Sequence, residues 1–180
     1  MDTENMVKMG SKQKALIQDL QSEQETVLMA ALETIRKDGT ADLIPHLIQL
    51  LVHNDEGEMV FEATRIILNE LKTVKAVEPI IKELSEEHTK DIRHILVGAL
   101  WESGLPVKDH LLFLVDLAIK DDYLTCLECL TVIENIEDRL DDEDLQAGIT
   151  QVQDALMRPS DKEDLLNGLI EVLNNFMMAN

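Results

Sequence analysis

The sequence predicts an all-α protein, a right-handed α-solenoid of four to five stacked antiparallel helical hairpins. An apolar position recurs about every 33 residues, at Val27, Val60, Ile92 and Leu124. Such a period is typical of arrays in which each unit stacks only on its neighbours. Hydrophobic residues make up 45% of the chain and aromatic residues only 3%, so the core must be aliphatic. With only four prolines and seven glycines in 180 residues, few positions interrupt a helix.

Two further registers of the repeat stay apolar in every unit. They follow the first register by three and by eight residues, a spacing that keeps all three on related faces of one helix. The second register comprises Ala30, Ala63, Ile95 and Leu127, and the third comprises Ile35, Leu68, Leu100 and Val132.

Periodicity and caps predict the boundaries of the helices. We expect residues 1–10 to be disordered and residues 11–176 to form a single repeat domain, with a frayed tail after it. Ser22 to Glu25 and Ser160 to Glu163 have the spacing of a capping box, so each is expected to open a helix. The expected helices cover about 12–21, 22–37, 41–53, 57–71, 74–87, 90–103, 107–120, 122–137, 142–157 and 160–176. The repeats fall at approximately 22–54, 55–88, 89–121 and 122–158, and a capping helix follows at 160–176.

The second helix of each predicted hairpin has one polar face. In the helix that begins near Ala41, polar residues fall at offsets of 0, 4, 7 and 11, while four leucines lie on the opposite side. Stacked second helices would present a continuous polar ridge on the concave surface of a curved array. Phe113 falls within this polar row, either as an exposed anchor or as a buried residue if the register differs by one. The candidate partner-binding residues are His46, Gln49, His53, Lys82, Glu86, Phe113, Asp116 and Lys120.

The net charge of −20 excludes some classes of partner. Nucleic acid is a polyanion that binds through Lys and Arg, and an anionic membrane surface is disfavoured for the same reason. We therefore expect no nucleic acid and no membrane partner. The acidity indicates either simple solubility or the binding of a partner protein with a basic surface.

Targeting signals are missing from the sequence as given. The first residues contain no apolar segment of a signal peptide, and no run approaches 18 apolar residues. We expect a cytoplasmic protein, in which the two cysteines are more typical of free thiols than of a disulfide.

The segment from Asp55 to Leu71 resembles the first helix of HEAT-like repeats. The family pattern has an acidic residue, then Val-Arg, then Ala and two leucines; here Phe61 takes the place of Arg. The third unit matches better. Its matching residues are Ile92, Arg93, Ala99 and Leu100, and Pro45 and Pro79 lie early in second helices, as in this family.

The chain is thus similar to HEAT-like helical repeats of the phycobilisome-lyase type over about 22–158. The resemblance implies a superhelical fold. It also implies that Arg93 pairs with an acidic residue of an adjacent repeat, as a structural contact rather than a binding residue. The signature residues of tetratricopeptide and ankyrin repeats are missing.

Residues able to do chemistry form no recognisable motif. Cys126 and Cys129 share one helix face, either as small core residues or as a redox or half-metal pair. The five histidines form no HExxH motif, and His46 and His53 lie about 10 Å apart along a helix, too far to share a metal ion. The acidic run Asp138 to Asp144 lacks the glycine of a calcium loop, so Asp141 to Asp144 are expected to cap the next helix. We expect no cofactor and no metal.

The sequence favours a non-catalytic protein-binding module or scaffold over an enzyme. The expected partner is another protein, bound along the second helices by a monomer or weak homodimer. The alternative is a HEAT-like enzyme or accessory factor of the bilin-lyase type, in which the cysteines would matter. HEAT-like DNA glycosylases use a basic groove, which this acidic chain does not provide. Trp101 lies on an apolar stripe, either as core filler or as an anchor for a partner.

Overall fold

The computed structural model describes residues 10–53 and 57–179, and throughout these ranges the regular structure is helical, with no strand. The prediction of an all-α protein is confirmed. Nine of residues 1–10, which we expect to be disordered, lie outside the described residues, as do residues 54–56 between the expected helices 41–53 and 57–71. The chain divides after Ile92 into two compact units, which are described separately.

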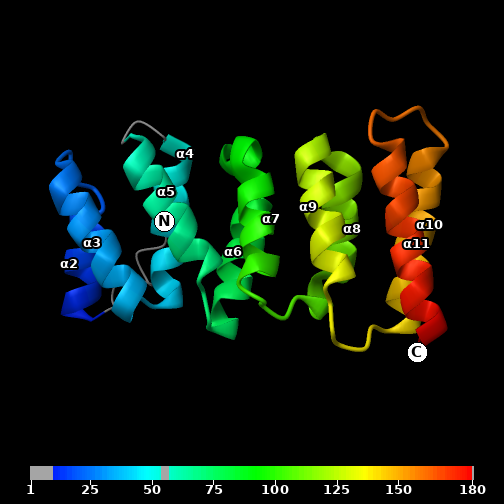
Figure 1. The fold of residues 1–180 in the computed structure, drawn as a ribbon, viewed down its shortest axis with the longest axis horizontal. Helices are drawn as coiled ribbons and strands as arrows, with labels where there is room; N and C mark the ends of the chain where they lie inside the picture. The colour runs from blue at the N-terminus through cyan, green and yellow to red at the C-terminus, as the bar shows by residue number, and fades with distance from the viewer. Residues whose placement is uncertain (1–9, 54–56, 180) are drawn as a thin grey trace. The chain divides into compact units, whose positions relative to one another are not determined.

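Unit 1, which ends at Ile92, consists of two helical layers (Figure 1). In one layer α3 packs on α5, and in the other α4 packs on α6; α4 and α5 also contact each other. The elements of unit 1 are α2 (Ser11–Asp19), α3 (Glu25–Asp38), η1 (Ala41–Leu43), α4 (Ile44–His53), α5 (Glu58–Asn69), η2 (Val74–Ala76), α6 (Val77–Leu84) and η3 (Glu87–Ile92).

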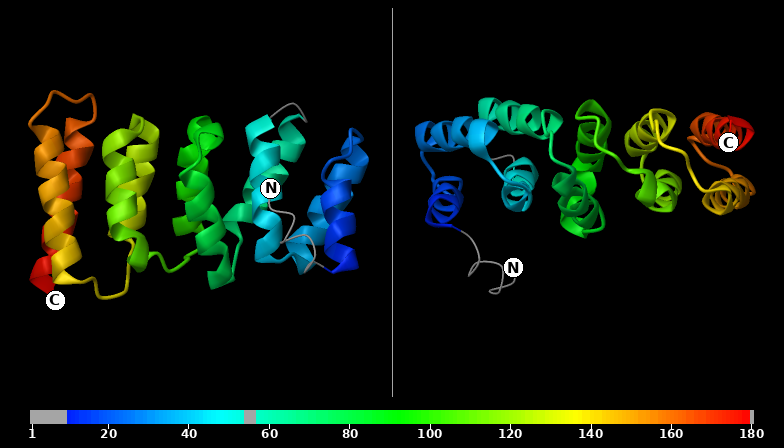
Figure 2. Two further views of the ribbon diagram at one scale, coloured as in Figure 1. Left: turned by 180° about the vertical axis from the view of Figure 1, so that it is seen from behind. Right: turned by 90° about the horizontal axis from the view of Figure 1, so that it is seen from below.

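Unit 2, which begins at Arg93, repeats this arrangement with longer C-terminal helices. Its first layer holds α7, α9 and α11, and its second layer holds α8 and α10, as the right-hand view of Figure 2 shows. The most extensive contacts join α7 to α9 and the hairpins α8–α9 and α10–α11. The elements of unit 2 are α7 (Arg93–Glu102), η4 (Lys108–His110), α8 (Leu111–Lys120), α9 (Tyr123–Glu134), α10 (Asp142–Leu156) and α11 (Glu163–Ala179).

Aliphatic side chains fill the core, as the composition predicts. The third register of the repeat, Ile35, Leu68, Leu100 and Val132, is buried at every position. The first register shifts by one residue at both ends of the chain: Val27 is half-buried and Leu124 exposed, whereas Leu28, Val60, Ile92 and Thr125 are buried. In the second register Ala30 and Leu127 are exposed.

Both predicted capping boxes are wrong in their geometry. The hydroxyl of Ser22 accepts the N–H of Gln24, and that of Ser160 accepts the N–H of Lys162, so α3 and α11 begin later than expected. The N–H of Ser22 already donates to the carbonyl of Asp19 at the end of α2. It therefore cannot receive the glutamate that completes a capping box.

Gly104 forms the turn that ends α7. Gly104 has φ +65°, a conformation that suits glycine, and its N–H donates to the carbonyl of Trp101. The N–H of Leu105 donates to the carbonyl of Leu100, which completes a Schellman motif at the end of α7. The expected fraying after Phe176 is not seen, because α11 continues through Ala179.

Candidate protein-binding surfaces

Helix α4 presents the first group of predicted contact residues. Its leucines, together with Leu43 of η1, are buried, while Gln49 and His53 are exposed on the opposite side. His46 is half-buried, and burial lowers the pKa of its imidazole, which favours the neutral form. The Nδ1 atom of His53 lies 2.8 Å from the carbonyl oxygen of Gln49, which holds the ring against its own helix.

Helix α6 continues this surface within unit 1. Val77, Ile80, Ile81 and Leu84 are buried, while Lys82 in α6 and Glu86 just after it are exposed. The buried hydroxyl of Thr89 donates to the carbonyls of Glu83 and Glu86 at 2.7 and 2.9 Å, and so closes the end of α6. Because α4 and α6 pack together, we call His46, Gln49, His53, Lys82 and Glu86 the α4–α6 polar face.

Helix α8 carries the remaining predicted contact residues, in unit 2. Lys120 is exposed and its Nζ lies 2.7 Å from a carboxylate oxygen of Asp116. Phe113 is half-buried, and so is neither a fully exposed anchor nor a fully buried core residue.

The other layer of unit 2 exposes a group of apolar side chains. Trp101 of α7 and Tyr123, Leu124 and Leu127 of α9 are all exposed, and we call them the α7–α9 apolar strip. The interpretation of Trp101 as core filler is therefore wrong. The strip is not apparent in the sequence, because the apolar side chains of α9 are spread around the helix. Leu124 and Leu127 could therefore equally have formed the face of α9 that packs in the core.

The two cysteines are core residues of α9. Both are free and buried; burial raises the pKa of the Cys126 thiol to about 11, and it also raises the pKa of the Cys129 thiol well above its ordinary value. A thiol in this state is a weak nucleophile and metal ligand. Among the residues that the structure describes, no group of His, Cys, Asp and Glu is arranged to hold a metal ion.

A buried cluster of charges joins three elements of unit 2. Nη1 of Arg93 lies 2.7 Å from Oδ2 of Asp121, and the Asp121 side chain is only 4% exposed. The ammonium of Lys162, also buried, donates to the carbonyls of Ala118 at 2.7 Å and of Asp121. A cation at the last carbonyls of α8 satisfies acceptors that the helix leaves open. Asp121 is the last residue of the predicted repeat 89–121 that also contains Arg93, so this ion pair lies within one predicted repeat.

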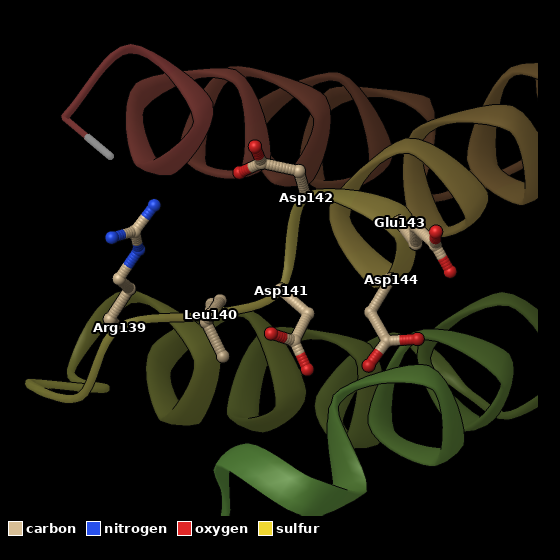
Figure 3. Close-up of a pocket in the computed structure, with 6 residues that line it drawn as sticks. All are labelled: Arg139, Leu140, Asp141, Asp142, Glu143 and Asp144. Atoms are coloured by element: carbon tan, nitrogen blue, oxygen red, sulfur yellow. The ribbon is translucent and has the colours of Figure 1, made fainter.

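The acidic connection before α10 forms a shallow, open depression of about 430 Å³, lined by residues 139–144 (Figure 3). The side chain of Asp142 points toward α11, while those of Asp141 and Asp144 point to the other side. Asp141 is the N-cap residue of α10, but its side chain makes no capping hydrogen bond. The acidic first turn still complements the dipole of α10.

Comparison of the chain with known protein families, with curated proteins and with solved structures finds no match. Within residues 10–53 and 57–179, no helix is both long enough and apolar enough to cross a membrane. The surfaces described above are therefore the basis for a functional proposal.

Proposed function

We propose that this protein is a non-catalytic protein-binding module or scaffold, built from HEAT-like repeats of the right-handed α-solenoid type. It binds a partner protein along its second helices, as a monomer or weak homodimer. Its two free thiols suit a reducing compartment, and we place it in the cytoplasm.

The observation that carries the proposal is the α4–α6 polar face. Two adjacent helices bury most of their aliphatic side chains and present polar side chains of different chemistry on the other side: an amide, two imidazoles of which one is half-buried, an ammonium and a carboxylate. A rigid, packed support lowers the entropy cost of binding, because the backbone beneath these side chains is already ordered. In unit 2, α8 likewise presents a carboxylate and an ammonium, those of Asp116 and Lys120.

The charge of the chain supports a basic partner. With 36 acidic and 16 basic side chains, the protein repels other acidic proteins and attracts basic surfaces. Complementary charge raises the rate of association and suppresses binding of wrong partners.

Site-specific photocrosslinking tests the proposal. Benzoylphenylalanine is placed at Gln49 or Lys82 on the α4–α6 polar face, and at the exposed Thr26 or Lys72 as matched controls. We expect one defined crosslinked partner from the first two positions, and its loss when the other face residues are replaced by serine. Equal crosslinking yields at all four positions would show that the face has no special role.

A further inference from the structure

We propose that the α7–α9 apolar strip binds a basic, amphipathic segment of a partner protein. Apolar side chains of that segment would cover Trp101, Leu124 and Leu127, and its Lys or Arg side chains would meet the carboxylates beside them. This surface lies on the first layer of unit 2, whereas the proposed contacts of α8 lie on the second layer (Figure 2). The inference is therefore independent of the role proposed for the second helices.

The apolar part of the strip lies on the outer side of α9. Leu124 is 53% exposed and Leu127 is 38% exposed, and a spacing of three residues keeps them on one face. The core side of the same helix is occupied by Cys126, Cys129 and Ile133. The two leucines therefore contribute apolar surface that the fold itself does not cover, and a partner that covers it gains free energy.

A hydrogen bond to α9 holds Trp101 of α7 in one orientation. Its indole Nε1–H donates to Oε2 of Glu128 at 2.9 Å, while 40% of the residue stays exposed. Gly98 makes room for this carboxylate, because a Cβ atom at that position would come within 3.3 Å of the same oxygen. An aromatic side chain that is fixed before binding loses little entropy on binding, which is a property of binding hot spots.

Acidic side chains lie beside the strip. Asp164 accepts a hydrogen bond from the hydroxyl of Tyr123 at 3.4 Å, Glu128 accepts one from Trp101, and the exposed Asp122 directly precedes Tyr123. The neighbouring cations Arg93 and Lys162 point inward, to Asp121 and to backbone carbonyls. The strip thus offers apolar contacts beside several carboxylates, which a Lys- or Arg-rich partner complements.

The same charges argue against a second copy of this chain as the occupant. From Arg93 onward the sequence contains 18 acidic and six basic side chains. Two copies that met at this strip would bring like charges together, and like-charge contacts disfavour association. A cationic Lys or Arg could also stack on the exposed face of Trp101.

The single tryptophan of the chain makes the test direct, because Trp101 is the only indole fluorophore. The probe is a tryptophan-free amphipathic helix of leucine and lysine, titrated into the full-length protein. The controls are the matched leucine–glutamate peptide and a lysine peptide of the same composition with scrambled order. We expect a blue shift of Trp101 emission and weaker acrylamide quenching with the amphipathic lysine peptide alone, and weaker binding at high salt.

Neutral variants locate the binding site without changing the charge. The double variant Leu124→Ser and Leu127→Ser should bind the lysine peptide about tenfold more weakly, because two apolar contacts are lost. Met157→Ser, at an exposed methionine elsewhere in unit 2, should bind as the wild type does. An unshifted Trp101 emission, an unchanged affinity of the double variant, or a blue shift that depends only on protein concentration would each overturn the proposal.

Discussion

In unit 1, the guanidinium of Arg36 binds both carboxylate oxygens of Glu70 at 2.8 Å, and both side chains are about half exposed. In unit 2, Arg93 binds Asp121 at a similar distance, but these side chains are 14% and 4% exposed. Water screens the first pair and is largely excluded from the second. Similar bond lengths therefore correspond to very different contributions to stability in the two units.

The surroundings of the two pairs differ as well. Asp121 also accepts the N–H of Asp122 through its other oxygen, and its own carbonyl accepts the ammonium of Lys162. Glu70 has no such network among its described contacts beyond Arg36. Unit 2 therefore holds a carboxylate, a guanidinium and an ammonium near one another and largely out of water.

The largest expected effect comes from Asp121→Ala. The substitution leaves the guanidinium of Arg93 largely buried without its carboxylate, which should lower the free energy of unfolding by about 3–5 kcal/mol. Denaturant unfolding followed by Trp101 fluorescence measures this change within unit 2. Asp109→Ala, at an exposed carboxylate in η4, is the matched control and should have little effect. An Asp121→Ala variant as stable as the wild type would show that the buried pair is not a structural contact.

A somewhat smaller effect is expected for Lys162→Met. Methionine fills a similar volume but cannot bond the carbonyls of Ala118 and Asp121, and hydrogen bonds to charged groups contribute about 1.5–3 kcal/mol each. Because the variant also removes the cost of burying an ammonium, we expect a net loss of about 2 kcal/mol. Hydrogen exchange should increase at the last turn of α8 and the first turn of α11. Unchanged exchange at both places would contradict this role of Lys162.

Cys126 should make the free energy of unfolding of unit 2 fall at alkaline pH. Unit 1 contains no cysteine and should not show this effect. Burial raises the pKa of this thiol from 9.0 to about 11, so the folded state favours the protonated form. The contribution of this thiol to stability is fully present below pH 9 and is lost as the pH rises toward 11. Allowing for solvent screening, we expect a loss of about 1–2 kcal/mol.

The control for the alkaline limit is Cys126→Ala, in which that part of the pH dependence should disappear. Unfolding of both proteins is compared between pH 8 and about pH 11, and the difference between them removes the effect of other titrating groups. Identical pH profiles of the two proteins would show that burial does not raise the pKa of the Cys126 thiol.

The sequence predicts the helices of the fold better than it predicts the buried charge cluster or the apolar strip. The second helices have a clear 3.6-residue period, so leucines such as Leu47 and Leu51 are buried as expected. Helix α9 is apolar on all sides, and periodicity could not choose between Leu124 and Cys126 for the core. The structure places the small cysteines inward, where neighbouring helices approach closely, and leaves the leucines outside.

Long-range contacts set the remaining differences. Lys162 lies in a segment that reads locally as the start of a helix, and nothing within that segment indicates that its ammonium bonds α8, more than 40 residues earlier. Similarly, Ser22 has the spacing of a capping box, but its backbone N–H already donates to the carbonyl of Asp19 at the end of α2. In both cases the residue bonds a group outside the local motif, and the motif alone does not indicate that group.

The smallest expected effect is that of Glu70→Gln in unit 1. The hydrogen bond from Arg36 lowers the pKa of Glu70, so the pair contributes above the pKa of the unfolded chain, and the contribution is lost as the pH falls. Since both side chains are exposed, water and salt screen the attraction, and the glutamine still accepts one hydrogen bond. We expect hydrogen exchange of α3 and α5 to match the wild type within experimental error at physiological salt. Glu62→Gln, which removes the exposed pair with Arg65 on α5, is the matched control. A loss at Glu70 as large as that at Asp121 would mean that burial does not distinguish the two pairs.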